Sequence, residues 1–184
     1  MPPLESVMKA LGTPMPAFVL PNLNGGGWVD SRTLSGKPVL VMFLCNHCPY
    51  VKHIREALAT LGRDLQSKSI HVLAISSNDA VAYPDDAPDR MTEEAREAGY
   101  AFPYCFDETQ DVARAFDAAC TPDFFLYDAQ HRLAYRGRLD GSRPRSTEPV
   151  TGSELRAAID AVLAGRAPAA QQHPSIGCSI KWRA

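Results

Sequence analysis

The sequence predicts one α/β domain with a mixed central sheet flanked by helices. Short apolar runs of the kind that form buried strands alternate with segments whose apolar residues recur every three or four positions, as on one face of a helix. Two further strand-like runs lie near the C-terminus, before the last helix. They add an antiparallel edge to a mostly parallel sheet. A length of 184 residues fits a single domain over the whole chain, 1–184.

The N-terminal part of the chain predicts an extension that precedes this sheet. Residues 1–16 are rich in proline, so we expect an extended lead-in with a helical turn around Glu5 to Leu11. Ala17–Leu20 is a short strand candidate, and Trp28-Val29 follows a turn of asparagine and glycine residues. The two segments predict an N-terminal β-hairpin.

The stretch Pro38–Ile54 is the one around which the rest is organised. Pro38–Leu44 is almost wholly apolar and predicts a buried strand. A Cys-x-x-Cys pair, Cys45 and Cys48, follows directly, and then the apolar residues take helical spacing: Val51, Ile54, Leu58, Leu61 and Leu65. The pair therefore lies where a buried strand passes into a helix.

The remaining elements follow from similar patterns. Ile70–Ser76, Ala101–Phe106, Phe124–Tyr127 and Leu133–Arg136 predict strands, the last two antiparallel to each other. Arg90–Ala98 and a segment from a cap at Asp107 to about Ala118 predict helices, and a capping box of Thr151 and Glu154 predicts the start of the final helix. Residues 164–184 contain isoleucine and tryptophan, so we expect a C-terminal tail that docks on the domain.

The position of the two cysteines predicts redox chemistry. The first turn of a helix leaves N–H groups unpaired and carries partial positive charge. A thiol at that place can have its pKa lowered into the range of roughly 3.5–7.5. We therefore expect Cys45 to be the nucleophile and Cys48 to close a disulfide on it, with a cationic His47 lowering the pKa of the thiol further.

Metal binding is the main alternative for this motif. Cys45, His47, Cys48 and His53 include zinc-ligand types, but no second Cys-x-x-Cys or His-x-x-x-His pair occurs in the sequence. The strand-to-helix context favours a dithiol, so we expect no metal and no organic cofactor.

The other cysteines and an acidic cluster have simpler interpretations. Cys105 is expected to be a small buried apolar residue. Cys120, two residues before Pro122, could serve packing or be an accessory thiol. Cys178 is expected to dock with the tail, the alternative being a third redox thiol that folds over the active site. Three aspartates are expected to lie in a solvated loop: Asp85, Asp86 and Asp89.

Composition limits the partners and the compartment. A net charge of −2 indicates neither a nucleic acid nor an anionic membrane surface as partner. No apolar run approaches the ~20 residues that span a bilayer, and the N-terminus lacks the apolar core of a signal peptide. An odd set of five cysteines without such a signal favours redox or metal chemistry over a disulfide framework, and we expect a cytoplasmic protein.

A strand that ends in Cys-x-x-Cys, followed by a helix and later by Cys120-Thr121-Pro122-Asp123, resembles the thioredoxin fold. The resemblance implies that the Thr121–Pro122 peptide bond is cis and packs against the dithiol. It also implies that His47, Thr121 and Pro122 contact the substrate, with the main chain of Thr121 pairing with it as a β-strand does.

The segments LGTPMPAFVLPNLNGG and GKPVLVMFL resemble the alkyl hydroperoxide reductase/thiol-specific antioxidant type of thioredoxin-like domain. CNHCPYVKH and PSIGCSIKW are similar to a bacterial subgroup of thioredoxin-family proteins. Together with the dithiol, the resemblance implies a thiol–disulfide oxidoreductase. Its partners would be a disulfide-containing protein or small thiol substrate and a dithiol reductant.

Two alternatives to that function remain open. A peroxiredoxin carries threonine or serine three residues before its peroxidatic cysteine, where this chain has Met42. Methionine cannot donate the hydroxyl hydrogen bond, which argues against a dedicated peroxidase. The alternatives are a thiol peroxidase, with Cys45 peroxidatic and Cys48 or Cys178 resolving, and a non-enzymatic redox-sensing or binding module.

Overall fold

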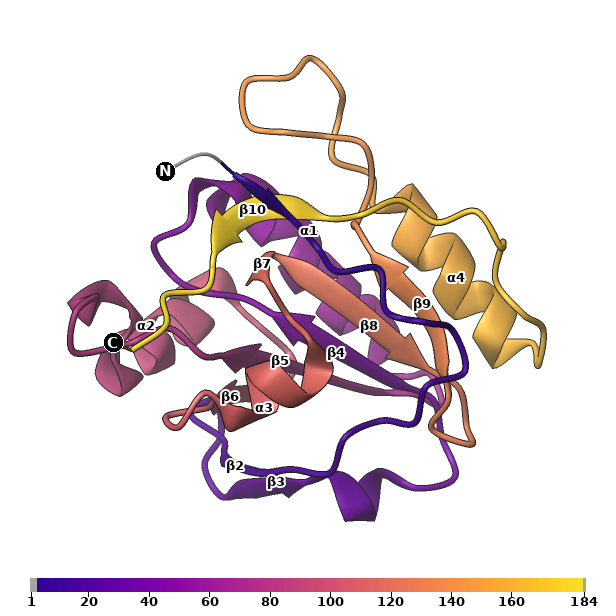
Figure 1. The fold of residues 1–184 in the computed structure, drawn as a ribbon, viewed down its shortest axis with the longest axis horizontal. Helices are drawn as coiled ribbons and strands as arrows, with labels where there is room; N and C mark the ends of the chain where they lie inside the picture. The colour runs from indigo at the N-terminus through magenta and orange to yellow at the C-terminus, as the bar shows by residue number, and fades with distance from the viewer. Residues whose placement is uncertain (1–2, 184) are drawn as a thin grey trace.

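The computed structural model describes residues 3–183 and has a five-stranded mixed sheet at its centre (Figure 1). The strand order is β6-β5-β4-β8-β9, in which β4, β5 and β6 are parallel and β8 and β9 are antiparallel to their neighbours. The bounds are β4 (Val39–Phe43), β5 (His71–Ser76), β6 (Tyr104–Phe106), β8 (Asp123–Tyr127) and β9 (Leu133–Gly137). The predicted α/β class with a mixed sheet is confirmed, and the fold is thioredoxin-like. Residues 1, 2 and 184 of the expected lead-in and tail lie outside the described part.

The two faces of the sheet are covered by different elements because side chains alternate along each strand. Leu40 and Met42 of β4 pack with three helices: α1 (Pro49–Leu65), α2 (Pro88–Ala98) and α4 (Ser153–Leu163). Val41 and Phe43 point the other way and pack against α3 (Asp111–Phe116) and the N-terminal hairpin, which is formed by β2 (Val19–Pro21) and β3 (Trp28–Asp30). The short 3-10 helices η1 (Ser31–Leu34) and η2 (Pro84–Asp86) lie in loops.

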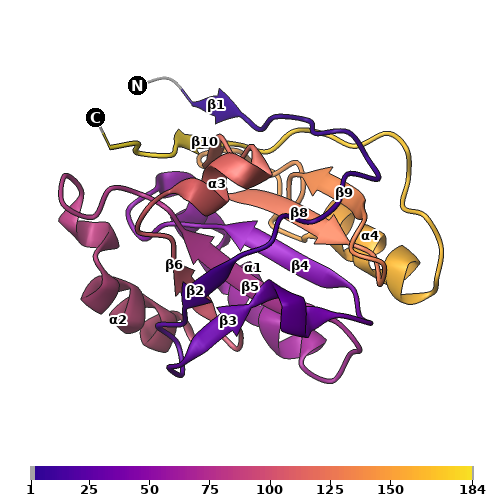
Figure 2. The ribbon, with the colours of Figure 1, turned by 60° about the horizontal axis from the view of Figure 1, so that its bottom comes forward.

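A second, three-stranded sheet joins the two ends of the chain. Its order is β1 (Leu4–Glu5), β10 (Ile176–Ser179) and β7 (Cys120–Thr121), all antiparallel. Figures 1 and 2 show β1 and β10 side by side on the outside of the domain. The helical turn predicted around Glu5 to Leu11 is wrong, because this segment pairs with the C-terminal tail through β1 and through Ser6, whose N–H donates to the Ser175 carbonyl at 2.9 Å.

The start of α4 also differs from the prediction. Its N-cap is Gly152, and the N–H groups of Thr151 and Gly152 donate to the Asp140 carboxylate at 2.7 and 2.6 Å. Glu154 is bound by Arg138 at 2.6 Å instead of closing a capping box. The prediction of a capping box is wrong because a distant aspartate takes over the capping role.

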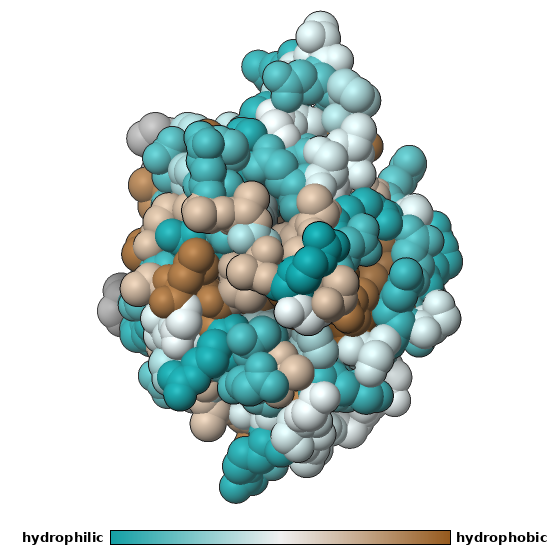
Figure 3. All heavy atoms as spheres, turned by 90° about the vertical axis from the view of Figure 1, so that its right-hand side faces the viewer, coloured by the Kyte–Doolittle hydropathy of each residue, from teal (hydrophilic) through white to brown (hydrophobic). Residues whose placement is uncertain are grey.

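The surface carries mostly hydrophilic residues on the side of α4, where hydrophobic residues occur in separate patches (Figure 3). The polar loop that leads from β9 to α4 projects from the domain in Figure 1. Within residues 3–183, none of the helices combines the length and the apolar character that a membrane span requires.

Candidate active site

The Cys-x-x-Cys pair lies at the end of β4, but the helix begins later than expected. Pro49 is the first residue of α1, and Cys48 is its N-cap. Cys45 therefore precedes the cap by three residues and does not lie in the first helical turn. Both sulfur-bearing residues are buried, Cys45 with 1% of its surface exposed and Cys48 with none, and both are free thiols.

The lowered pKa expected for Cys45 belongs to Cys48 instead. The thiol of Cys45 donates to the Cys48 sulfur, and hydrogen bonds from the Cys178 thiol and from the Val51 and Cys178 N–H groups add to it. Together they lower the pKa of Cys48 to about 5 against the opposing effect of burial. The same bond to Cys48, burial and the nearby Asp86 carboxylate raise the pKa of Cys45. The direction is the reverse of the one predicted, because Cys45 donates its hydrogen bond to Cys48, and because Cys48 rather than Cys45 is the N-cap of α1.

The Thr121–Pro122 loop packs directly on the dithiol, and its peptide bond is cis as predicted. The Thr121 hydroxyl lies 3.2 Å from the Cys45 sulfur. The Thr121 carbonyl oxygen lies 3.2 Å from the Cys48 sulfur and accepts from that thiol when it is protonated. This acceptor favours the protonated form, but the four donors around Cys48 outweigh it.

The C-terminal strand β10 occupies the edge of β7 beside the dithiol. Cys178 pairs with Thr121 in the antiparallel register, and Ser179 pairs with Cys120. Gly177 is required for this approach, since a Cβ atom there would lie 1.9 Å from the Thr121 carbonyl oxygen. The main-chain edge of Thr121 that was expected to receive a substrate is thus filled by the chain itself.

The other two cysteines are buried in strands. Cys105 is fully buried in β6, as expected, and burial raises its pKa to about 12. Cys120 is also fully buried, with its thiol 3.9 Å from the Pro122 carbonyl oxygen, and burial raises its pKa. Cys120 is therefore a packed residue in this structure.

Asp86 forms a polar network beside Cys45. It is fully buried, although a solvated loop position was predicted, whereas Asp85 and Asp89 are exposed. Its carboxylate accepts from the Asn46 N–H at 2.7 Å, and from two side chains: His47 Nδ1 at 2.5 Å and Asn78 Nδ2 at 2.8 Å. The sequence offers three nearby aspartates, and no pattern among them indicates which one turns inward.

The His47–Asp86 pair is an ion pair in character. Burial alone would raise the pKa of Asp86, but hydrogen bonds from His47 and Asn78 and the charge of His47 lower it overall. The hydrogen bond to Asp86 raises the pKa of His47. Tyr83 stacks on the imidazole with ring centroids 5.5 Å apart. His47 is thus held in place on the Asp86 side of the site, with 23% of its side chain exposed.

The same residues include metal-ligand types. Potential ligand atoms of Cys45, His47 and Asp86 lie within 4.8 Å of one another, whereas His53 contacts Ser142 instead. The 2.5 Å between His47 Nδ1 and Asp86 Oδ2 is a hydrogen-bond distance. Two such ligands on one tetrahedral zinc ion would be about 3.3 Å apart. The arrangement fits a hydrogen-bonded pair better than a metal site, and the absence of a metal requirement stays a prediction.

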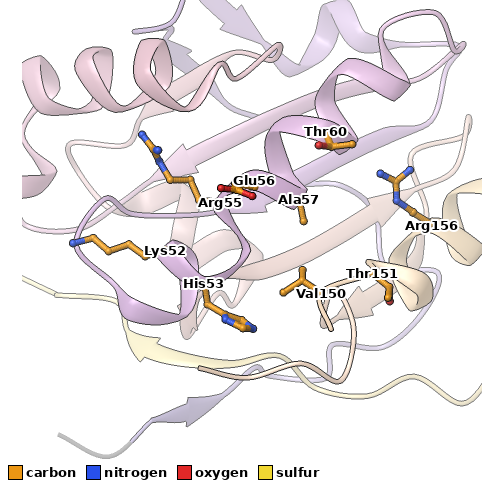
Figure 4. Close-up of a pocket in the computed structure, with 9 residues that line it drawn as sticks. All are labelled: Lys52, His53, Arg55, Glu56, Ala57, Thr60, Val150, Thr151 and Arg156. Atoms are coloured by element: carbon orange, nitrogen blue, oxygen red, sulfur yellow. The ribbon is translucent and has the colours of Figure 1, made fainter. Parts of the chain in front are cut away.

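A cavity of about 580 Å³ lies along the outer face of α1, opposite the loop before α4 (Figure 4). No cysteine lines it. Two of its cationic side chains are paired, Arg55 with Glu94 at 2.6 Å and Arg156 with Asp64 at 2.8 Å. It therefore contributes nothing to the dithiol chemistry.

Comparisons with known proteins support the family and the fold. A model of the AhpC/TSA family matches residues 11–136. A crystal structure of an uncharacterized conserved protein from Geobacillus kaustophilus is 50% identical and has a TM-score of 0.96, with 100% of this chain and 97% of that chain covered. A hypothetical protein from Sinorhizobium meliloti is 47% identical, with a TM-score of 0.95 and 98% of each chain covered.

A more distant structure supports the fold alone. A putative thioredoxin from Neisseria meningitidis is 24% identical with a TM-score of 0.63, over 82% of this chain and 89% of that one. A search of the curated proteins gave no match.

Proposed function

The chain belongs to the AhpC/TSA family and has a thioredoxin-like fold, and on this basis we propose that it is a thiol–disulfide oxidoreductase whose redox pair is Cys45 and Cys48. The observation that carries the proposal is the placement of both thiols beside Thr121 before the N-terminus of α1: the Cys45 sulfur lies 3.2 Å from the Thr121 hydroxyl and the Cys48 sulfur 3.2 Å from the Thr121 carbonyl oxygen. A thiolate is the attacking species in disulfide exchange. The hydrogen bonds that lower the pKa of Cys48 favour a thiolate on that residue.

We assign attack to Cys48 and resolution to Cys45, the reverse of the roles expected from the sequence. The Cys48 thiolate attacks one sulfur of a substrate disulfide, and the other substrate sulfur leaves with the electron pair and takes a proton. Cys45 then loses its proton and attacks the Cys48 sulfur. The Cys45–Cys48 disulfide forms, the mixed disulfide breaks, and the second substrate sulfur leaves as a thiol.

The substrate class in this proposal is a disulfide-containing protein or a small disulfide, and a separate dithiol reductant regenerates the Cys45–Cys48 pair. His47, Thr121 and Pro122 remain the residues that we propose to contact the substrate. Since β10 fills the edge of Thr121 in the reduced protein, pairing of a substrate strand there applies to a state in which β10 has moved.

The role assignment is tested with insulin and oxidised glutathione as disulfide substrates. We expect Cys48→Ser to abolish exchange, because the attacking sulfur is gone. The double variant Cys45→Ser/Cys178→Ser should accumulate a mixed disulfide on Cys48, visible by mass spectrometry of the intact protein. Cys105→Ala, at a buried position remote from the pair, is the matched control and should turn over normally. Normal turnover by Cys48→Ser would contradict the assignment.

A thiol peroxidase is the second candidate, and family membership is the observation that favours it. Met42, fully buried in β4, provides no hydroxyl group at the position from which a peroxiredoxin orients its peroxide. We therefore rank disulfide exchange first. Hydrogen peroxide consumption measured on the same preparation decides the order, because faster turnover of peroxide than of disulfide would reverse the ranking.

A further inference from the structure

The reduced site raises a problem of access. Cys45 and Cys48 are almost wholly buried, so neither sulfur can meet an external thiol or disulfide while β10 stays docked. Cys178 is the one cysteine among the described residues that is partly exposed. It lies on the strand that covers the dithiol.

Cys48 is the central sulfur of three. Its sulfur lies 3.2 Å from the carbonyl oxygen of Thr121, the residue with which Cys178 pairs. Cys178 also packs against the core cluster that contains Cys45 and Cys48. In keeping with this placement, hydrogen bonds from both neighbouring thiols lower the pKa of Cys48. Thiols that close on a common sulfur in this way are placed for exchange between two alternative disulfides, since attack needs contact with the sulfur that is displaced.

The main chain holds Cys178 at this position. On one edge β10 pairs with β7, and on the other edge it pairs with β1, through Leu4 opposite Gly177 and Glu5 opposite Ile176. The Ser175 hydroxyl donates to the Pro122 carbonyl at 2.6 Å. Beyond the strand, the N–H of Lys181 donates to the Asn78 side chain at 2.8 Å. These strand pairs and hydrogen bonds fix the position of Cys178 relative to the dithiol.

We propose that Cys178 is a third redox residue, and that Cys48 exchanges its disulfide partner between Cys45 and the partly exposed Cys178. This inference rests on the proposed dithiol function and adds the route by which an external thiol reaches the buried pair. The site so defined takes a thiol reductant, of low molecular weight or presented by a protein, at the Cys178 sulfur.

Two external thiols supply the electrons for the reduction, and no other oxidant or reductant takes part. In the oxidised protein, the Cys178 thiol loses its proton and its sulfur attacks Cys48. The Cys48–Cys178 bond forms, the Cys45–Cys48 bond breaks, and the Cys45 sulfur leaves with the electron pair and takes up a proton. An external thiolate then attacks the Cys178 sulfur, and Cys48 leaves as a thiolate. A second external thiol resolves the mixed disulfide on Cys178.

The acidities of the three groups fit this order of events. Burial and the neighbouring Cys48 raise the pKa of Cys178 to about 12, so it keeps its proton while Cys48 is a thiolate. Formation of the Cys45–Cys48 disulfide removes the negative charge from Cys48 and with it part of that effect. The low pKa of Cys48 makes it the better leaving group when an external thiol attacks the Cys48–Cys178 bond.

Cys120 does not fit the same role, although it lies on the neighbouring strand. It is opposite Ser179 in the register, fully buried, and directed to the Pro122 carbonyl oxygen. An accessory thiol for Cys48 must be both in contact and reachable from solvent, and Cys178 alone of the two meets these conditions.

The first test is disulfide mapping after oxidation with oxidised glutathione, by alkylation, digestion without reductant and mass spectrometry. We expect Cys45→Ser to form the Cys48–Cys178 disulfide as its main product, and wild type to contain it beside Cys45–Cys48. A Cys45→Ser protein that carries only glutathione on Cys48, with Cys178 free, would overturn the inference.

The second test is the rate at which reduced glutathione reduces the oxidised protein. We expect Cys178→Ser to slow this step at least about tenfold, because the remaining disulfide is reached only through local opening of β10. Cys105→Ala should match wild type. If wild type forms the Cys45–Cys48 disulfide and turns over disulfides while oxidised Cys178→Ser is reduced as fast as wild type, the role of Cys178 is wrong and the proposed function stands. If wild type forms no Cys45–Cys48 disulfide, the proposed function fails with it.

Discussion

The dithiol is enclosed from two sides that are built in different ways. On one side, the buried Asp86 carboxylate of η2 binds the Asn46 N–H and the His47 side chain, the two residues between the cysteines. On the other side, β10 covers Cys48 with main chain from the far end of the sequence. The Asp86 side is held by hydrogen bonds to a charged side chain, and the β10 side is held by main-chain strand pairing.

The two sides of the site affect two different properties of the dithiol: which cysteine carries the negative charge, and whether its sulfur can be reached. The Asp86 charge disfavours a thiolate on Cys45, whereas the N–H of Cys178 favours one on Cys48. Both sides therefore direct the negative charge to Cys48, but only the β10 side decides whether that sulfur can be reached. Changes on the β10 side should act on accessibility, and changes on the Asp86 side should act on pH dependence.

The largest expected effect comes from Gly177→Ala. The added methyl group would lie 1.9 Å from the Thr121 carbonyl oxygen, a main-chain atom that cannot turn away, so β10 must leave its place. We expect alkylation of Cys45 and Cys48 by iodoacetamide to become about 100-fold faster, corresponding to a loss of about 3 kcal/mol in the free energy that closes β10 over them.

Gly141→Ala is the matched control for that variant. Its methyl group would lie 2.6 Å from a carboxylate oxygen of Glu148, the far end of a flexible side chain, and 3.8 Å from Arg138, which is an ordinary contact. The cysteines should therefore stay protected. Equal protection of both cysteines in Gly177→Ala and wild type would show that β10 is not what limits access.

The same contrast explains how far sequence reasoning reached. The unbroken apolar run Pro38–Leu44 and the helical spacing of the apolar residues in α1 are strong signals, so the central strand and the position of the dithiol could be predicted. The pairing of Cys178 with Thr121 could not, because it involves a two-residue strand and a glycine contact between distant segments. A strand of two residues is too short to show the alternation of apolar and polar residues by which a strand is recognised in a sequence.

Asp86 was missed for a different reason. Its inward direction depends on three donors that only the folded loop brings together, and an aspartate beside two others looks solvated in sequence. The reversal of the two cysteine pKa values follows from the hydrogen bond that Cys45 donates to Cys48, and Cys45 precedes the N-cap of α1 by three residues. A Pro49 at the first helical position was the available signal for that boundary.

A medium effect is expected on the Asp86 side, from His47→Ala. Because the pKa of His47 is raised in the folded protein, its contribution to stability is present below its unfolded pKa of about 6.5 and is lost as the pH rises through the folded value. The lowered pKa of Asp86 makes its contribution present above an unfolded value of about 3.9 and lost in acid. The ion pair should thus stabilise the fold most between about pH 4 and 6.5.

Urea unfolding at pH 5.5 and pH 8.5 measures this window. We expect His47→Ala to lower the free energy of unfolding by about 1–2 kcal/mol at the lower pH and by less at the higher, since the imidazole is partly exposed. The variant Asp86→Asn should abolish the pH dependence that wild-type His47 confers. An equal loss in His47→Ala at both values would mean that the pair is held by an uncharged hydrogen bond.

The smallest expected effect comes from Thr121→Val, at the residue that contacts both cysteines and pairs with β10. This variant tests whether the pKa of Cys45 can be changed without changing the access that β10 controls. The Thr121 hydroxyl contacts Cys45, whereas the Thr121 main chain contacts Cys48 and pairs with Cys178. Thr121→Val keeps the branched shape and the main chain but removes the hydroxyl, whose hydrogen bond lowers the pKa of Cys45. The pKa of Cys45 should therefore rise further.

As the resolving residue, Cys45 should then close on a Cys48 mixed disulfide more slowly, by about two- to tenfold, the value of one hydrogen bond. The closure can be followed by release of a chromogenic thiol from Cys48 in a Cys178→Ser background. Alkylation of Cys178 in the single Thr121→Val variant should stay at the wild-type rate, because β10 pairs with the main chain of Thr121. A faster reaction at Cys178 would mean that the hydroxyl also helps to hold β10, and that charge and access are coupled through this one side chain.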